Sequence, residues 1–240
     1  MTKINLMYHD VVSYTDGTSG FQNIEALQYK VDCQLFEAHL KTIEGGGGRL
    51  TFDDGGISAY TCVAPLLEKY DLIGIFFIPT AYIDKPGFLT RNQIVELHRR
   101  GHIIGSHSHT HPVNMTSLDY MEICSEWKTS LEILSNIIGE RIDVASVPNG
   151  YTSKNILKAA KECGINVLYT SEPTDNVSSQ CGMTIYGRYV IHDKATAEDV
   201  AHIVNSKKFR WLRHFRWRLI EMAKIVLGPL YGPLKKYIVH

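Results

Sequence analysis

Strand-like and helix-like patterns alternate along most of this sequence. Short apolar runs, such as residues 4–8 and 73–78, predict strands, and the run at 73–78 is typical of a strand buried on both faces. Between these runs, apolar residues recur at helical spacing, as in residues 117–138 and 196–205. No internal repeat is evident. The pattern predicts an α/β fold with a parallel sheet and crossover helices, either open or closed into a barrel.

The basic residues are concentrated at the C-terminal end. The 240 residues suffice for one α/β domain with a small appendage, and their formal net charge is zero. Residues 206–240, however, contain nine Lys or Arg and a single acid, Glu221. We therefore divide the chain into a folded body at 1–205 and a basic tail at 206–240.

Within the tail, residues 207–227 have a basic amphipathic pattern. Apolar residues recur every three or four positions from Phe209 to Val226, and Trp211 and Trp217 lie among them. A helix of this kind either lies on an anionic membrane surface or packs on the body with a solvated basic face. No nucleic-acid-binding motif accompanies the basic residues, so we expect no nucleic-acid partner.

The five cysteines are scattered, odd in number and without a Cys-x-x-Cys pair. This usage argues against a disulfide framework and for a reducing compartment. The first residues contain no apolar stretch long enough for a signal peptide, and no run of about 18 apolar residues occurs. We expect a cytoplasmic protein whose membrane contact, if it has one, is peripheral and at the inner face.

Two adjacent carboxylates, Asp53 and Asp54, follow a short apolar run and precede Gly55 and Gly56. In a continuous strand their side chains would point to opposite faces. A sharp turn at the strand end, which glycine permits, lets both face one pocket. There each would raise the pKa of the other unless a cation were bound. The alternative is an ordinary acidic turn after a strand.

A second cluster of titratable residues, His107, His109 and His111, follows another predicted strand. On a helical turn His107 and His111 would face one side and His109 another. The carboxyl ends of parallel strands open onto one face, so Asp54 would meet the two histidines there. Two imidazoles, one carboxylate and an open position predict a catalytic divalent-metal site, most naturally for Zn²⁺. Asp53 would then act as base for a water molecule.

These two stretches carry a family resemblance. Thr-Phe-Asp-Asp-Gly at 51–55 and His-Ser-x-x-His at 107–111 resemble the first two motifs of the polysaccharide deacetylases, the NodB-homology carbohydrate esterases. The flanking residues are similar too, over most of residues 1–200. The resemblance implies a distorted (β/α) barrel of about seven strands. It also implies metal-dependent N-deacetylation of an amino sugar.

The resemblance also implies roles for single residues. Asp53 would be the catalytic base, and Asp54, His107 and His111 the metal ligands. In the third motif of the family an arginine that orients the base stands two positions before a proline, but here Ser146 takes its place. The turn that follows is expected to line the substrate site and to hold an oxyanion through a backbone N–H. Its residues are Pro148, Asn149, Gly150 and Tyr151.

Two histidines are candidates for the general acid that protonates the leaving amine. Met-Tyr-His-Asp at 7–10 is similar to an early motif of the subgroup of poly-N-acetylglucosamine deacetylases, and we prefer His9 for this reason. His192 is the candidate by the Leu-x-His pattern near the C-terminal end of many other members. The alternative for either residue is a histidine held by hydrogen bonds at the barrel rim. The glycines at 45–48 are interpreted as a shortened connector.

The expected function is therefore removal of N-acetyl groups from an amino-sugar glycan, in exopolysaccharide or cell-surface glycan biosynthesis. A deformylase or another amide hydrolase acting on a lipid-linked amino sugar would use the same residues. A catalytically silent carbohydrate-binding protein on the same fold is the competing class, and the missing arginine is its only support.

Overall fold

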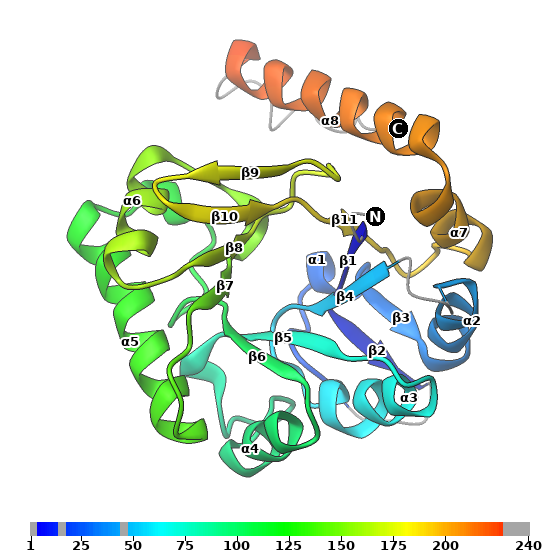
Figure 1. The fold of residues 1–240 in the computed structure, drawn as a ribbon, viewed down its shortest axis with the longest axis horizontal. Coiled ribbons are helices and arrows are strands. Elements are labelled where there is room, and N and C mark those ends of the chain that lie inside the picture. Colours follow the sequence, from blue (N-terminus) through cyan, green and yellow to red (C-terminus); the bar gives the residue numbers. More distant parts are fainter. Residues whose placement is uncertain (1–3, 14–17, 44–47, 228–240) are drawn as a thin grey trace.

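The computed structural model of the chain describes residues 4–13, 18–43 and 48–227. In that part, a curled sheet of nine strands is surrounded by helices (Figure 1). Neighbouring strands follow the order β11-β1-β4-β5-β6-β7-β8-β10-β9. The strands of this sheet are β1 (Ile4–Tyr8), β4 (Gly48–Phe52), β5 (Gly74–Ile78), β6 (Ile103–Ser106), β7 (Val144–Ser146), β8 (Val167–Tyr169), β9 (Val177–Gln180), β10 (Met183–Tyr186) and β11 (Tyr189–Val190).

Most helices lie around the outside of the curl, whereas the short helix α1 lies within the ring in the view of Figure 1. The helices are α1 (Ile24–Leu27), α2 (Cys33–Ile43), α3 (Ala64–Lys69), α4 (Arg91–Arg99), α5 (Tyr120–Ile138), α6 (Lys154–Glu162), α7 (Ala197–Asn205) and α8 (Lys207–Leu227). The π turn η1 (Ala59–Val63) and the 3₁₀ turns η2 (Thr80–Tyr82), η3 (Met115–Ser117) and η4 (Pro148–Gly150) connect them. Among the described residues, no helix combines the length and the apolar character needed to cross a membrane.

The expected α/β fold is confirmed, and the sheet forms an open, distorted barrel. Every pairing in the large sheet is parallel except that of β9 with β10. Within the described residues the sheet ends at β11 and β9, so no ladder of hydrogen bonds closes it. The β9–β10 hairpin was not predicted, because β9 reads Val-Ser-Ser-Gln and is exposed along its length. No apolar run marks such a strand.

Strand β5 shows how the sheet is buried on both faces. Phe76 and Ile78 belong to the main core beneath the outer helices. Ile75 and Phe77 point to the other face and pack inside the curl with Tyr169. This confirms the prediction from the continuous apolar run. Each such side chain, when fully buried, stabilises the fold by about 1.5–3 kcal/mol.

Capping residues determine where the helices begin. Thr90 and Thr196 open α4 and α7 with the capping boxes that their sequences predict. Helix α5 begins at Tyr120 and is capped by Asp119, whereas Ser117, where the helical pattern was expected to begin, lies in η3. Aspartate is as good an N-cap as serine, so the apolar spacing alone did not distinguish the two starts.

Two local features concern the segments beside β4. Pro65 stands in the first turn of α3, where its missing N–H costs no hydrogen bond, and the π turn η1 directly precedes this helix. Of the glycine connector, residues 45–47 lie outside the described residues, and Gly48 begins β4.

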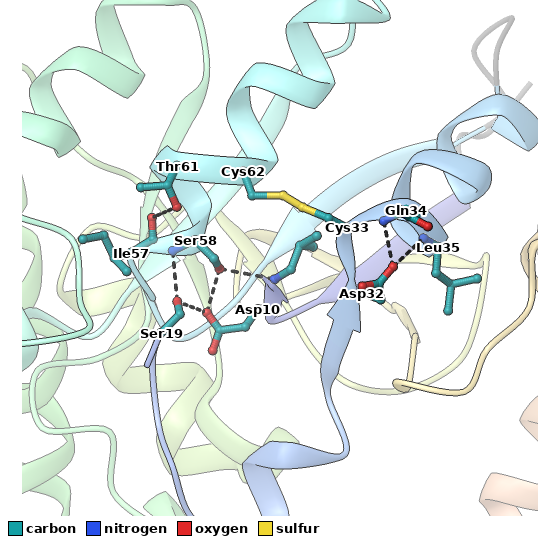
Figure 2. The surroundings of a disulfide bond; sticks show 11 residues. Asp10, Ser19, Asp32, Cys33, Gln34, Leu35, Ile57, Ser58, Thr61 and Cys62 are labelled. Atoms are coloured by element: carbon teal, nitrogen blue, oxygen red, sulfur yellow. Dashed lines mark hydrogen bonds between the residues drawn. A yellow bond between two sulfur atoms is a disulfide. The ribbon is translucent and has the colours of Figure 1, made fainter. Parts of the chain in front are cut away.

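A disulfide joins Cys33, at the start of α2, to Cys62 in η1 (Figure 2). The expectation against disulfides was wrong for this pair, because the fold brings together two cysteines that are 29 positions apart. Beside it, the buried Asp10 accepts hydrogen bonds from the hydroxyls of Ser19 and Ser58 at 2.6 and 2.8 Å (Figure 2). Disulfides persist in oxidising compartments, so this pair argues against the cytoplasmic location, which stays a prediction.

The disulfide lies where a second, two-stranded sheet meets η1. This parallel sheet pairs β2 (Asp10–Val12) with β3 (Lys30–Asp32). Lys30 reaches the Asp10 carboxylate at 3.3 Å, and Val11 donates its backbone N–H to Ser58 at 3.2 Å. The disulfide and these polar contacts together hold the small sheet beside the loop that follows β4.

Candidate active site

The end of β4 carries the two adjacent carboxylates into one cavity. Asp54 has a φ of 73° and Gly55 a φ of 61°, so the chain turns sharply directly after the strand. As expected, the turn lets both Asp53 and Asp54 line the same cavity. Gly56 is required for a different reason: a Cβ there would lie 2.1 Å from a carboxylate oxygen of Asp10. Close approach of the backbone to a buried acid thus fixes this turn.

Asp54, His107 and His111 converge on one point. The Oδ1 atom of Asp54 lies 3.5 Å from Nε2 of His107 and 3.3 Å from Nε2 of His111. The three ligand atoms all lie within 4.8 Å of one another. Ligands about 2.0–2.2 Å from a tetrahedral ion are separated by roughly 3.4 Å, so two of the three separations already match. These residues could therefore hold a divalent metal ion.

The backbone around the histidines differs from the expected helical turn. His111 has a φ of 56°, and residues 107–114 form bends rather than a helix. His107 and His111 nevertheless face one point, because the left-handed residue turns the chain back toward the cavity. His109 faces elsewhere, as expected: its Nδ1 lies 2.8 Å from the hydroxyl of Thr80.

The tautomer of His107 suits a metal ligand. Its Nδ1 lies 3.0 Å from the carbonyl oxygen of Ser146. A carbonyl only accepts, so Nδ1 must carry the proton and donate it. The lone pair of Nε2 then points toward Asp54. Metal-ligating histidines are commonly oriented in this way.

Arg188 takes the place of the missing motif arginine. It is fully buried, and its two terminal nitrogens donate to the two carboxylate oxygens of Asp53 at 2.6 and 2.8 Å. Ser146, the residue found at the motif position, adds a hydroxyl that donates to Asp53 at 3.2 Å and accepts from Arg188 at 2.6 Å. The guanidinium thus reaches Asp53 from the turn between β10 and β11 instead of from the strand β7.

The charges of the site hold both carboxylates ionised. Burial raises the pKa of Asp53, but the charges of Arg188 and His107 outweigh it, and the net shift is downward. Burial likewise raises the pKa of Asp54, and its close contacts with His107 and His111 bring that pKa well below its usual range. Burial lowers the pKa of His107, whereas Asp53 and Asp54 raise it, with a net upward shift.

The cavity above these residues has a volume of about 250 Å³. His9 lines it, and the Nδ1 atom of His9 is buried without a hydrogen-bond partner among the described residues. The His9 ring lies against Tyr29, with centroids 4.6 Å apart, and His192 stacks on Tyr29 at 5.0 Å. His192 does not belong to the lining of the cavity. Of the two candidate acids, the structure therefore brings only His9 to the carboxylates.

The turn after β7 reaches the cavity through one residue. Asn149, with a φ of 53°, lines the cavity, whereas Pro148 is buried and does not belong to the lining. The N–H of Gly150 already donates to the carbonyl of Val147 at 3.3 Å, so it is not a free oxyanion donor. Tyr151 is 43% exposed and lies outside the lining. Of the four residues predicted here, the structure places Asn149 in the lining of the cavity.

Sequence reasoning missed Arg188, Tyr29 and Phe21. Phe21 lines the cavity and lies against the ring of His111, with centroids 5.0 Å apart. Phe21 and Tyr29 come from a stretch in which no periodic pattern indicates which aromatic residues face inward. Arg188 carried a weak signal, because it is a single charge in the otherwise uncharged run from Tyr186 to Ile191.

Sequence comparison agrees with this geometry. A family model described as polysaccharide deacetylase matches residues 48–168, which contain both motifs. YxkH of Bacillus subtilis (strain 168), whose name places it among the polysaccharide deacetylases, is 26% identical over 210 residues, which are 78% of this chain and 68% of YxkH. The peptidoglycan-N-acetylmuramic acid deacetylase PdaA of the same organism is 31% identical over 125 residues, which are 51% of this chain and 45% of PdaA.

Solved structures share the fold. The deacetylase PplD of Streptococcus pyogenes has a TM-score of 0.71 at 19% identity, over 85% of this chain and 99% of that one. IcaB from Ammonifex degensii has a TM-score of 0.70 at 16% identity, over 85% of this chain and 97% of that one. The family model covers half of the chain and includes the residues that converge in the cavity. The chain therefore belongs to the polysaccharide deacetylase family.

Proposed function

We propose that this chain is a metal-dependent hydrolase that removes N-acetyl groups from an amino-sugar saccharide, in the assembly of an exopolysaccharide or another cell-surface glycan. One observation carries the proposal: three candidate metal ligands and a separately held carboxylate share one cavity. The names of similar proteins support the substrate class, since PdaA is named for deacetylation of N-acetylmuramic acid in peptidoglycan.

The donor set supports a divalent ion, with Zn²⁺ as the first choice. Two imidazole nitrogens and one carboxylate oxygen are typical of catalytic zinc sites that keep a position open. Asp54, His107 and His111 would hold the ion. When bound, such an ion supplies Lewis acidity, which lowers the pKa of a water molecule and polarises an acyl carbonyl.

The protein residues account for the proton transfers of amide hydrolysis. Asp53 is ionised and accepts the proton that water loses as its oxygen bonds to the acyl carbon. His9, which follows the neighbouring strand β1 and lines the same cavity, donates a proton to the nitrogen as the C–N bond breaks. The products are a free amine and a carboxylic acid. Arg188 does not touch the substrate in this scheme, and it holds Asp53 in place.

The structure weakens the case for a catalytically silent protein. That case depended on the missing motif arginine, and Arg188 supplies an equivalent guanidinium in contact with Asp53. A deformylase is the alternative enzyme, because the same residues would cleave a formamide. It would differ from a deacetylase in the acyl group that it removes. Comparing acetate with formate release from matched amino-sugar substrates distinguishes the two.

The test combines metal content with acetate release. Protein stripped with a chelator should lose activity on N-acetylated amino-sugar oligosaccharides and regain it when Zn²⁺ is added. His107→Ala and His111→Ala should lose both the bound metal and the activity, because each removes one of three ligands. His109→Ala is the matched control, since His109 belongs to the same segment but bonds to Thr80. Full metal content in the His107→Ala/His111→Ala double variant would contradict the metal site.

A further inference from the structure

The sequence of the tail left two alternatives open, a helix that packs on the body and a helix that lies on a membrane surface. Helix α8 has features of both. Its inner side packs on the body at both ends. Near the start, Nε of Arg210 lies 2.9 Å from the carboxylate of Asp175. Toward the other end, Nζ of Lys224 lies over the ring of Tyr151, 5.9 Å from its centroid. The helix is therefore laid along the body rather than projecting from it.

The contacts place α8 at the rim of the catalytic cavity. Arg213 donates to the carbonyl of Val190 at 3.3 Å, and Val190 lines the cavity. His214 lies 3.7 Å from the carboxylate of Glu172, which follows the cavity-lining Ser171. These contacts come from strand β11 and from the segment at 171–172, both of which contribute to the cavity wall. The outer side of α8 is thus about one helix diameter, roughly 10–12 Å, from the rim.

The outer side of α8 exposes a row of large apolar side chains, here called the apolar stripe. Its members are Trp211, Leu212, Phe215, Leu219, Met222 and Val226, which are between 46 and 82% exposed. At 3.6 residues per turn these positions fall within one narrow arc of the helix. The rings of Trp211 and Phe215 stack at 5.4 Å, so the stripe has an aromatic end near the start of the helix. Contiguous exposed apolar surface of this kind marks an interaction site.

Basic side chains lie on the same exposed side of the helix. The exposed ones are Lys207, Lys208, Arg216 and Arg218. The only acid in the helix is Glu221, and it pairs with Lys224 at 2.6 Å. An apolar stripe with aromatics and basic flanks matches an anionic lipid surface in both polarity and charge.

We propose that the apolar stripe docks this chain on an anionic lipid bilayer, with α8 lying in the plane of the interface. Burial of the stripe supplies a contribution that salt does not remove, and the four basic residues supply one that salt screens. Docking brings the cavity rim within about one helix diameter of the lipid headgroups. If the proposed deacetylase activity holds, the cavity is then placed to receive an amino sugar carried on a lipid anchor.

The test is co-sedimentation of the full-length protein with vesicles, which requires no catalytic activity. Full-length protein should pellet with vesicles containing phosphatidylglycerol and stay in solution with pure phosphatidylcholine. The triple variant Trp211→Glu/Phe215→Glu/Leu219→Glu should lower the apparent affinity at least about tenfold, because it places charges in the buried stripe. The matched control is Ile73→Glu/Met121→Glu/Val177→Glu, which changes three exposed apolar residues elsewhere and should bind like the unchanged protein.

Three results would overturn the proposal. One is unchanged protein that stays in the supernatant with anionic vesicles at low salt, which would mean that the stripe does not bind lipid. Another is equal vesicle binding by the stripe variant and the control, with circular dichroism showing that both are folded. The third is a dimer in light scattering that the stripe variant alone abolishes, since the stripe would then bind a second copy.

Discussion

Asp53 and His9 follow neighbouring strands, β4 and β1, into the catalytic cavity, but the two side chains are held in different ways. Asp53 receives hydrogen bonds from Arg188 on both of its oxygens and a further one from Ser146. His9 lies against the ring of Tyr29, and its buried Nδ1 has no hydrogen-bond partner in the described residues. The base is thus oriented before substrate arrives, whereas the orientation of the proposed acid depends on ring packing and on the substrate itself.

The residues that surround each side chain explain this difference. Arg188 lies inside the curl of the sheet, where its guanidinium also lies over the ring of Phe77, 5.5 Å from the centroid. Side chains packed among strands have few alternative positions. His9 instead follows β1 at the rim, and Tyr29 comes from a connection between α1 and β3. The difference suits the proposed roles of the two residues. Asp53 takes a proton from water, whereas His9 must adjust to the position of the leaving nitrogen.

The largest effect is expected for Asp53→Asn. A positioned general base contributes on the order of 10²–10⁴ in rate, so kcat should fall at least about a hundredfold. The variant should keep its metal, because Asp54 and the two histidines are unchanged. Metal analysis and steady-state kinetics on the same preparation check both points. Loss of the metal from Asp53→Asn would show that the two carboxylates have opposite roles.

The next effect is expected for His9→Ala, with His192→Ala as its comparison. Protonation of the amine matters as the C–N bond breaks, so His9→Ala should lower kcat about a hundredfold and change KM much less. His192→Ala should have a far smaller effect, because His192 lies behind Tyr29 and outside the cavity. A larger loss of kcat in His192→Ala than in His9→Ala would assign the acid role to His192.

The smallest of the three effects on kcat is expected for Arg188→Lys. Lysine keeps the charge but loses the two-point contact, and a charged hydrogen bond contributes about 1.5–3 kcal/mol, so kcat should fall about tenfold. In the Asp53→Asn background the same change should have little further effect on kcat, because Arg188 acts through Asp53. Additive losses in the double variant would mean that Arg188 supports the reaction by another route. Thermal unfolding of each variant shows whether a loss of kcat comes instead from a loss of folded protein.

The residues that sequence predicted well are those whose signal is local. Asp53 and Asp54 are adjacent, and His107 and His111 are four positions apart, so each pair shows its geometry within one turn of the chain. Arg188 lies 135 positions from Asp53, and no spacing rule links a single arginine to a carboxylate so far away. The disulfide between Cys33 and Cys62 was missed for the same reason, because pairing depends on how the helices pack.

The fold class could be predicted from the sequence, whereas the strands at the β9 edge of the sheet could not. Buried parallel strands have apolar runs that indicate them, as β5 does. The exposed strand β9 has none, so the β9–β10 hairpin, and with it the turn that carries Arg188, had no signal in the apolar pattern. The helical spacing of His107 and His111 predicted correctly that these two residues face one point. The backbone between them was predicted wrongly, since His111 has a positive φ and no helical turn forms there.

The long sequence separation between Asp53 and Arg188 has a consequence for how the site forms. Contacts between distant residues close long loops, and they form slowly compared with contacts inside a helix or hairpin. The segment that supplies Asp54 and both histidines is synthesised well before Arg188 leaves the ribosome. Until then Asp53 has no guanidinium partner, and burying it would leave an unpaired charge. The arginine contact that orients Asp53 therefore forms only when the last strands join the sheet, and no single segment of the chain can form it alone.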